Sequence, residues 1–96
     1  MGLLEVATKC VERLASENEF VAGVILFGSV ARGEEVERSD IDLLVLWEGL
    51  DVDPSERHVY VYRVVSRYFP PSVALTVLDM EYSRFLRTRK LTPLLL

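Results

Sequence analysis

The segment IDLLVLW, residues 41–47, limits the possible folds of this chain more than any other part of the sequence. It is short, apolar at nearly every position, and directly preceded by Asp40. A strand with one face in water alternates apolar and polar residues, whereas a strand covered on both faces is a nearly continuous apolar run. We therefore expect residues 41–47 to form the central strand of a small sheet, with both of its faces covered.

Two further elements are predicted before this strand. Apolar residues recur at helical spacing from Leu3 to Leu14, which predicts an amphipathic opening helix. The single cysteine, Cys10, falls on the apolar face of that helix, so we expect a core thiol rather than a nucleophile. Residues 21–27, VAGVILF, are an apolar run with β-branched side chains that ends at Gly28, and this run predicts a strand.

Capping residues place the elements that follow the central strand. Asp53-Pro54-Ser55-Glu56 combines a capping aspartate, proline at the first helical position and glutamate three residues after the cap, so it predicts a helix that ends before Pro70. Residues 73–78 are expected to form a third strand, and Asp79 to cap a last helix that runs to about Lys90. This order of elements indicates an α/β (α+β) fold with a small mixed β-sheet packed against helices.

Length and composition indicate one globular domain over residues 1–96. Half of the 96 residues are hydrophobic, and the formal net charge of −4 argues against a broad nucleic-acid-binding surface. Nucleic-acid binding through a small surface stays open as an alternative, because the sequence has a local basic cluster. The cluster consists of Arg84, Arg87, Arg89 and Lys90. We expect neither a signal peptide nor a membrane-spanning segment, and a single cysteine fits a reducing, cytoplasmic location.

Asp40 and Asp42 are the first candidates for a functional site. Residues two apart on a strand point to the same side, so these carboxylates are expected to project together and to repel each other. Protonation of one carboxyl, an arginine partner or a divalent cation would relieve the repulsion, and two solvated or capping aspartates are the structural alternative. Mg²⁺ usually takes one or two carboxylates and completes its shell with water and substrate phosphates.

The turn Gly28-Ser29 is the second candidate. Glycine lets the backbone approach a ligand closely, and N–H groups at such a turn can hold phosphate oxygens, with the Ser29 hydroxyl as a further donor. By itself, Gly-Ser also occurs in ordinary strand-to-helix turns. If the strands at 21–27 and 41–47 are neighbours, however, the turn lies beside the two aspartates, and the pair would suit a metal–triphosphate.

The motif that joins these residues, GSVARGEEVERSDIDLLV, resembles the signature of the nucleotidyltransferase superfamily related to DNA polymerase β. It is most similar to the minimal nucleotidyltransferase (MNT) domains, whose length and element order the whole chain matches. The resemblance implies the nucleotidyltransferase fold, phosphate binding by Gly28 and Ser29, and Mg²⁺ (alternatively Mn²⁺) held by Asp40 and Asp42. Arg32 matches the family's Arg-Gly, either as a phosphate contact or as a brace for the loop.

The implied activity is transfer of a nucleotide, AMP from ATP by preference, to an acceptor hydroxyl with release of pyrophosphate. Active relatives usually carry a third carboxylate on a later strand, and the matching position here is Ala74. Thr76 shares its strand face but has no charge, Asp79 is expected to face away, and Glu48 is remote. Two aspartates could still bind metal and nucleotide, whereas loss of a base slows turnover by about 10²- to 10⁴-fold.

The resemblance also implies a partner, because minimal domains are commonly paired with small all-helical HEPN proteins in toxin–antitoxin systems. There the nucleotidyltransferase is the antitoxin, and it acts by transfer of AMP to a tyrosine of the partner or by binding alone. The apolar end of the chain, LTPLLL, is expected to fold back on the core or to contact a partner. A small-molecule acceptor such as an aminoglycoside is a weaker alternative. Base preference, acceptor and oligomeric state, a homodimer included, are left open.

Overall fold

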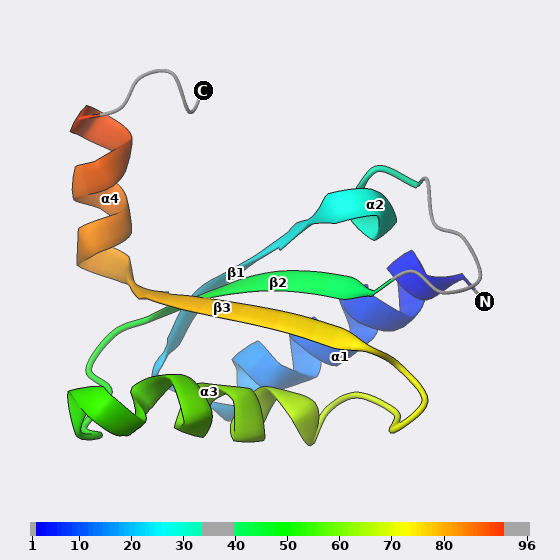
Figure 1. The fold of residues 1–96 in the computed structure, drawn as a ribbon, viewed down its shortest axis with the longest axis horizontal. Helices are drawn as coiled ribbons and strands as arrows, with labels where there is room; N and C mark the ends of the chain where they lie inside the picture. Colours follow the sequence, from blue (N-terminus) through cyan, green and yellow to red (C-terminus); the bar gives the residue numbers. More distant parts are fainter. Residues whose placement is uncertain (1, 34–39, 92–96) are drawn as a thin grey trace.

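The computed structural model describes residues 2–33 and 40–91, with the backbone alone for 89–91 (Figure 1). Its elements are α1 (Leu3–Glu17), β1 (Val21–Phe27), α2 (Gly28–Ala31), β2 (Ile41–Trp47), the 3₁₀ turn η1 (Pro54–Glu56), α3 (Arg57–Ser66), β3 (Leu75–Glu81) and α4 (Tyr82–Leu91). The predicted α+β arrangement with a small mixed sheet is confirmed, and both strands that flank the motif have the predicted bounds. The tail LTPLLL lies outside the described residues, except for the backbone of Leu91.

The segment 41–47 is the central strand of the sheet, as predicted. β2 pairs with β1 in antiparallel orientation, with Phe27 opposite Asp42, and with β3 in parallel orientation, with Thr76 opposite Asp42. The end of β1 and the starts of β2 and β3 therefore meet at one end of the sheet. This topology brings the Gly28 turn to the first residues of β2.

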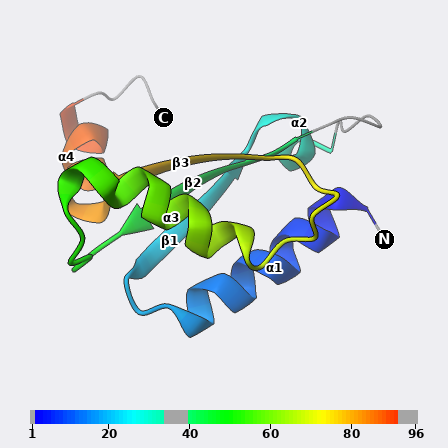
Figure 2. The same ribbon diagram turned by 60° about the horizontal axis from the view of Figure 1, so that its bottom comes forward.

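One face of the sheet carries the hydrophobic core. The helices α1 and α3 both lie on this face (Figure 2). Ile41, Leu43 and Val45, alternate residues of β2, are fully buried there, together with Leu14 of α1 and Val61 of α3. Each such side chain contributes about 1.5–3 kcal/mol when it leaves water, so this layer is the main source of stability.

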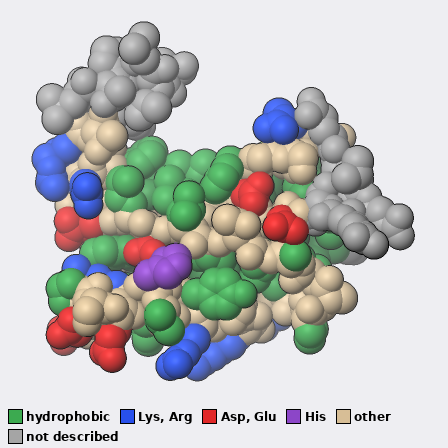
Figure 3. Space-filling view, viewed as in Figure 1, with side chains coloured by type: hydrophobic (Ala, Val, Ile, Leu, Met, Phe, Trp, Pro, Cys, Tyr) green, Lys and Arg blue, Asp and Glu red, His purple; other side chains and the backbone are tan. Residues whose placement is uncertain are grey.

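The opposite face of the sheet is open along much of its length. The prediction that both faces of the central strand are covered holds there at Leu46, which is 4% exposed, and is wrong for the rest of this face. Leu44 is half-buried on this face, and its cross-strand neighbours Ile25 and Leu78 are 37% and 50% exposed. The helices α2 and α4 rise at the two ends of the face, and hydrophobic side chains are visible between them (Figure 3). The apolar run therefore reflects a core on one side and an exposed apolar surface on the other.

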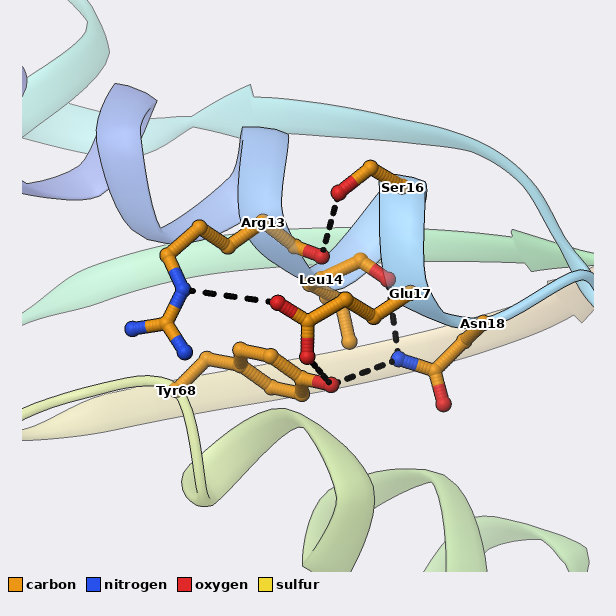
Figure 4. A network of polar contacts seen from close by, with 6 residues as sticks. All are labelled: Arg13, Leu14, Ser16, Glu17, Asn18 and Tyr68. Atoms are coloured by element: carbon orange, nitrogen blue, oxygen red, sulfur yellow. Dashed lines mark hydrogen bonds and ion pairs between the residues drawn. The ribbon is translucent and has the colours of Figure 1, made fainter.

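A polar network joins the end of α1 to the segment after α3 (Figure 4). The Tyr68 hydroxyl donates to Oε1 of Glu17 and accepts from Nδ2 of Asn18, each over 3.1 Å. The Asn18 amide also donates to the Leu14 carbonyl, and the Arg13 guanidinium lies 5.5 Å from the centroid of the Tyr68 ring. Partly exposed contacts of this kind contribute little energy individually, but together they fix how the two helices lie on the sheet.

The predicted cap of the third helix is confirmed, with a different first turn. Oδ1 of Asp53 accepts hydrogen bonds from the hydroxyl (2.8 Å) and the N–H (3.0 Å) of Ser55, and these bonds lower the pKa of Asp53. Residues 54–56 form a 3₁₀ turn, and α3 proper begins at Arg57. The helix ends at Ser66, before Pro70, as expected.

The predicted capping role of Asp79 is wrong. β3 continues to Glu81 and α4 begins at Tyr82, so Asp79 is a strand residue. Its carboxylate accepts a hydrogen bond from Nε1 of Trp47, whose side chain is buried. The Asp79 side chain therefore satisfies a buried indole N–H instead of the N-terminus of a helix. None of the helices in residues 2–33 and 40–91 has the length and apolarity that a bilayer span requires.

Candidate active site

The two parts of the motif meet at one end of the sheet. Gly28 follows directly after β1 and has a φ of +79°, a conformation that side chains disfavour. A Cβ at this position would overlap Oδ2 of Asp42 and lie 3.0 Å from its Cγ. Glycine is thus required twice, by the backbone and by the neighbouring carboxylate. A ligand bound at Asp42 would also touch the backbone of the turn.

The short helix α2 holds the other predicted residues of this turn. Val30 is fully buried and anchors the helix in the core. The N–H of Arg32 donates to the carbonyl of Gly28 (3.3 Å), which closes the helical turn. Ser29 is half-buried at the second position of α2, and Arg32 is exposed at its end. Residues 34–39 of the motif lie outside the described residues.

The two aspartates lie beside this turn. Asp40 is exposed and immediately precedes β2, while Asp42 is half-buried on the open face of the sheet. In residues 2–33 and 40–91, no group of three or more His, Cys, Asp or Glu side chains is placed to hold a metal ion. Two carboxylate donors beside a glycine turn nevertheless fit Mg²⁺ that arrives with a nucleotide, because substrate phosphates and water supply the remaining ligands.

The neighbouring strand provides no third carboxylate on this face. Ala74 stands beside the aspartates, since its carbonyl accepts the Ile41 N–H (2.9 Å) and the next pair in register is Ile41 with Leu75. Thr76 lies directly opposite Asp42 and is exposed. The strand register therefore places Ala74, where the family resemblance implies a third acid, beside the two aspartates.

The other acidic candidates are not near Asp42. Asp79 points to the opposite face of the sheet, as expected from strand alternation, because it bonds the buried Trp47. Glu48 follows the far end of β2, six residues along the strand and thus roughly 20 Å away, and its N–H donates to the Phe20 carbonyl. Neither of them can complete the site.

Cys10 belongs to the core, as predicted. It is half-buried on α1 and packs against the buried cluster. Burial raises the pKa of its thiol, although the charge of Arg13 acts in the other direction. A raised pKa means less thiolate, which makes a nucleophilic role unfavourable.

Sequence reasoning missed a second polar cluster at the other end of the sheet. Nδ1 of His58 lies 2.8 Å from Oδ1 of Asp79, and Nε1 of Trp47 donates to Oδ2 of Asp79 over 3.0 Å. The three residues come from α3, β3 and β2 and are separated by up to 32 positions. No local motif joins them, so only the fold shows the cluster.

Comparison with known proteins identifies the family. Residues 7–87 match the family model described as a nucleotidyltransferase domain. The chain belongs to the nucleotidyltransferase family. It is 33% identical to a crystal structure from Sulfolobus solfataricus titled as a nucleotidyltransferase, with a TM-score of 0.58, over 88% of this chain and 72% of that one.

A curated relative is also similar to this chain. A Methanocaldococcus jannaschii protein named as a protein adenylyltransferase is 36% identical over 64 residues. That match covers 67% of this chain and 42% of the relative, so the chain spans less than half of the relative's length. The nucleotidyltransferase resemblance of the motif is confirmed, and a transferase is supported.

The contact between Gly28 and Asp42 can be tested by Gly28→Ala, with Gly49→Ala as the matched control. Both glycines have positive φ, +79° and +64°, but a Cβ on Gly49 would meet nothing within 4 Å. We expect Gly49→Ala to lower the free energy of unfolding by about 1 kcal/mol. Gly28→Ala should cost about 1–3 kcal/mol more, because its Cβ must displace the Asp42 carboxylate.

The measurements are urea unfolding and the affinity for Mg²⁺–ATP of both variants. Gly28→Ala should weaken nucleotide binding by at least about tenfold, a loss of 1.4 kcal/mol, while Gly49→Ala should leave it unchanged. Equal stability and equal affinity of the two variants would contradict the close contact.

Proposed function

We propose that this nucleotidyltransferase domain transfers AMP from Mg²⁺–ATP to a hydroxyl group of a partner protein. The observation that carries the proposal is the packing of the Gly28 turn against Asp42, which joins a surface for phosphates to a carboxylate pair. The name of the M. jannaschii relative supports the choice of AMP and of a protein acceptor.

In the proposed site, Asp40 and Asp42 would hold Mg²⁺, and the backbone of Gly28 and Ser29 would lie along the nucleotide phosphates. When bound, the cation neutralises charge that develops on the phosphoryl oxygens. Arg32, exposed at the end of α2, is a candidate for a further phosphate contact. The chain's own contribution is mainly positioning, which is the larger part of catalysis in phosphoryl transfer.

The reaction is a displacement at the α-phosphorus. The acceptor oxygen forms a bond to this phosphorus while the bond to the oxygen that bridges to the β-phosphate breaks, and pyrophosphate leaves with the electron pair. The hydroxyl proton has to pass to solvent or to a group on the acceptor, because Ala74 stands where a base would be placed. Turnover without this base should be slow, by about 10²- to 10⁴-fold.

The open face of the sheet favours a protein as acceptor over a small molecule. Ile25, Leu44 and Leu78 present apolar surface on the same face as Asp42. Exposed apolar surface next to a polar site is typical of protein interaction surfaces. The partner we propose is a small all-helical HEPN protein with a reactive tyrosine, in a toxin–antitoxin pair in which this chain is the antitoxin.

A second function is favoured by the same strand. Because Ala74 and Thr76 offer no carboxylate beside Asp42, the domain could retain nucleotide binding and neutralise its partner by docking alone. The two functions differ in whether label from ATP becomes covalently attached to the partner.

The test is incubation with α-³²P-ATP, Mg²⁺ and small all-helical HEPN proteins from the source genome as candidate partners. We expect label on the partner with the wild-type chain and none above background with Asp40→Asn/Asp42→Asn, which removes both anionic donors. Complex formation is measured in parallel by gel filtration. A stable complex without label transfer would reject the transferase and leave docking as the function.

Ala74→Asp provides a gain-of-function test. An aspartate here would stand beside Asp40 and Asp42, and we expect the transfer rate to rise by about 10²-fold or more. Ala22→Asp is the matched control, since it makes the same substitution at an exposed strand position at the other end of the sheet, outside the proposed acceptor surface. If both variants left the rate unchanged while still binding nucleotide, the missing acid would not limit turnover.

A further inference from the structure

A cavity of about 380 Å³ lies at the other end of the sheet from the candidate active site. Its lining includes Trp47, Arg57, His58, Asp79, Glu81 and Arg84. The cavity takes Trp47 and Glu81 from the ends of β2 and β3, whereas Asp42 and its neighbour Thr76 lie near the starts of these strands. The cavity is therefore separate from the aspartates and the glycine turn.

Asp79 holds two other lining residues of this cavity in place through hydrogen bonds. Its side chain is only 13% exposed, and each carboxylate oxygen has a partner, Nδ1 of His58 for one and Nε1 of Trp47 for the other. The charge of Asp79 is thus compensated by hydrogen bonds. Because the Asp79 carboxylate accepts from Nδ1–H of His58, the second ring nitrogen, Nε2, is the one left for a ligand, and it donates to a phosphate oxygen when the ring is an imidazolium. The His58 side chain is 63% exposed.

Arg57 is held in place before any ligand arrives. Its Nε donates to the Val52 carbonyl over 2.9 Å, and its guanidinium carbon lies 4.9 Å from the centroid of the Trp47 ring. A guanidinium has further N–H donors at its two terminal nitrogens. A fixed guanidinium loses little side-chain entropy on binding an anion.

Arg84 supplies a second guanidinium from a different element. It lies in the first turn of α4 and is exposed, and among the described residues no carboxylate forms an ion pair with it. Glu81, half-buried at the end of β3, faces the same cavity and opposes an anion. Arg57, Arg84 and the imidazole of His58 thus line the same cavity. Of its two carboxylates, Asp79 is hydrogen-bonded to His58 and Trp47, and Glu81 remains to oppose an anion.

We propose that this cavity is a second ligand site, which binds a phosphate group of a small molecule through Arg57, Arg84 and His58. Guanidinium groups match the geometry of phosphate oxygens and form two parallel hydrogen bonds with them. The site goes beyond the proposed transfer reaction, because its residues lie at the opposite end of the sheet from Asp42.

The chain has a single histidine, so its imidazole resonances report on this cavity without ambiguity. The experiment titrates the ¹³C/¹⁵N-labelled protein, free of Mg²⁺, with inorganic phosphate, pyrophosphate and AMP. We expect saturable shifts of the His58 resonances with a dissociation constant of about 1 mM. Tighter binding of AMP would identify a nucleotide as the ligand, and equal binding would identify the phosphate group alone.

Two variants that should change the phosphate affinity in opposite directions test the assignment of the site. Arg84→Gln should weaken binding by about tenfold, because a charge-assisted hydrogen bond is lost. Glu81→Gln should strengthen it about threefold or more, because an opposing charge is removed. Arg87→Gln, on the same helix but outside the cavity lining, is the matched control and should change nothing.

Two results would overturn the proposal. The first is the absence of His58 shifts with any of the three ligands up to about 20 mM, well above millimolar affinity. The second is loss of the shifts in Asp40→Asn/Asp42→Asn with no change in Arg84→Gln, which would assign the binding to the candidate active site.

Discussion

Where β1 ends, the backbone of Gly28 lies so close to the carboxylate of Asp42 that no methyl group fits between them. This contact depends on the antiparallel pairing of β1 with β2, which sets Phe27 opposite Asp42. It also depends on the buried Val30, which fixes the turn that follows. The fold thus converts two short sequence patterns, far apart in the motif, into one surface where phosphates and a cation could be bound together.

The two faces of the sheet differ, and the proposed function rests on this difference. The helices α1 and α3 bury one face and supply the stability that lets the other face remain open. On the open face, exposed apolar residues lie next to Asp42, between α2 and α4. In the proposed function, nucleotide and acceptor meet on this face.

Much of this arrangement could be predicted from local sequence. The apolar runs at 21–27 and 41–47 gave the bounds of β1 and β2, and the Asp53 cap gave the start of the third helical segment. Two features needed the tertiary structure. Asp79 looked like a helix cap because helix caps and strand ends share the same residue types, and its partners Trp47 and His58 are distant in sequence. The open face was missed because an apolar run gives no information about whether the covering layer lies within the chain. The metal ligands, the nucleotide and the partner stay predictions.

The central claim is that Asp42 and the Gly28 turn bind a nucleotide through a cation. Isothermal titration calorimetry with a non-hydrolysable ATP analogue, with and without Mg²⁺, tests it most directly. The account predicts that Mg²⁺ raises the affinity of the wild-type chain at least about tenfold, or 1.4 kcal/mol. Asp42→Asn should lose this increment, and Glu48→Gln, at the exposed far end of the same strand, should keep it. Equal affinities with and without Mg²⁺ in all three proteins would contradict the account.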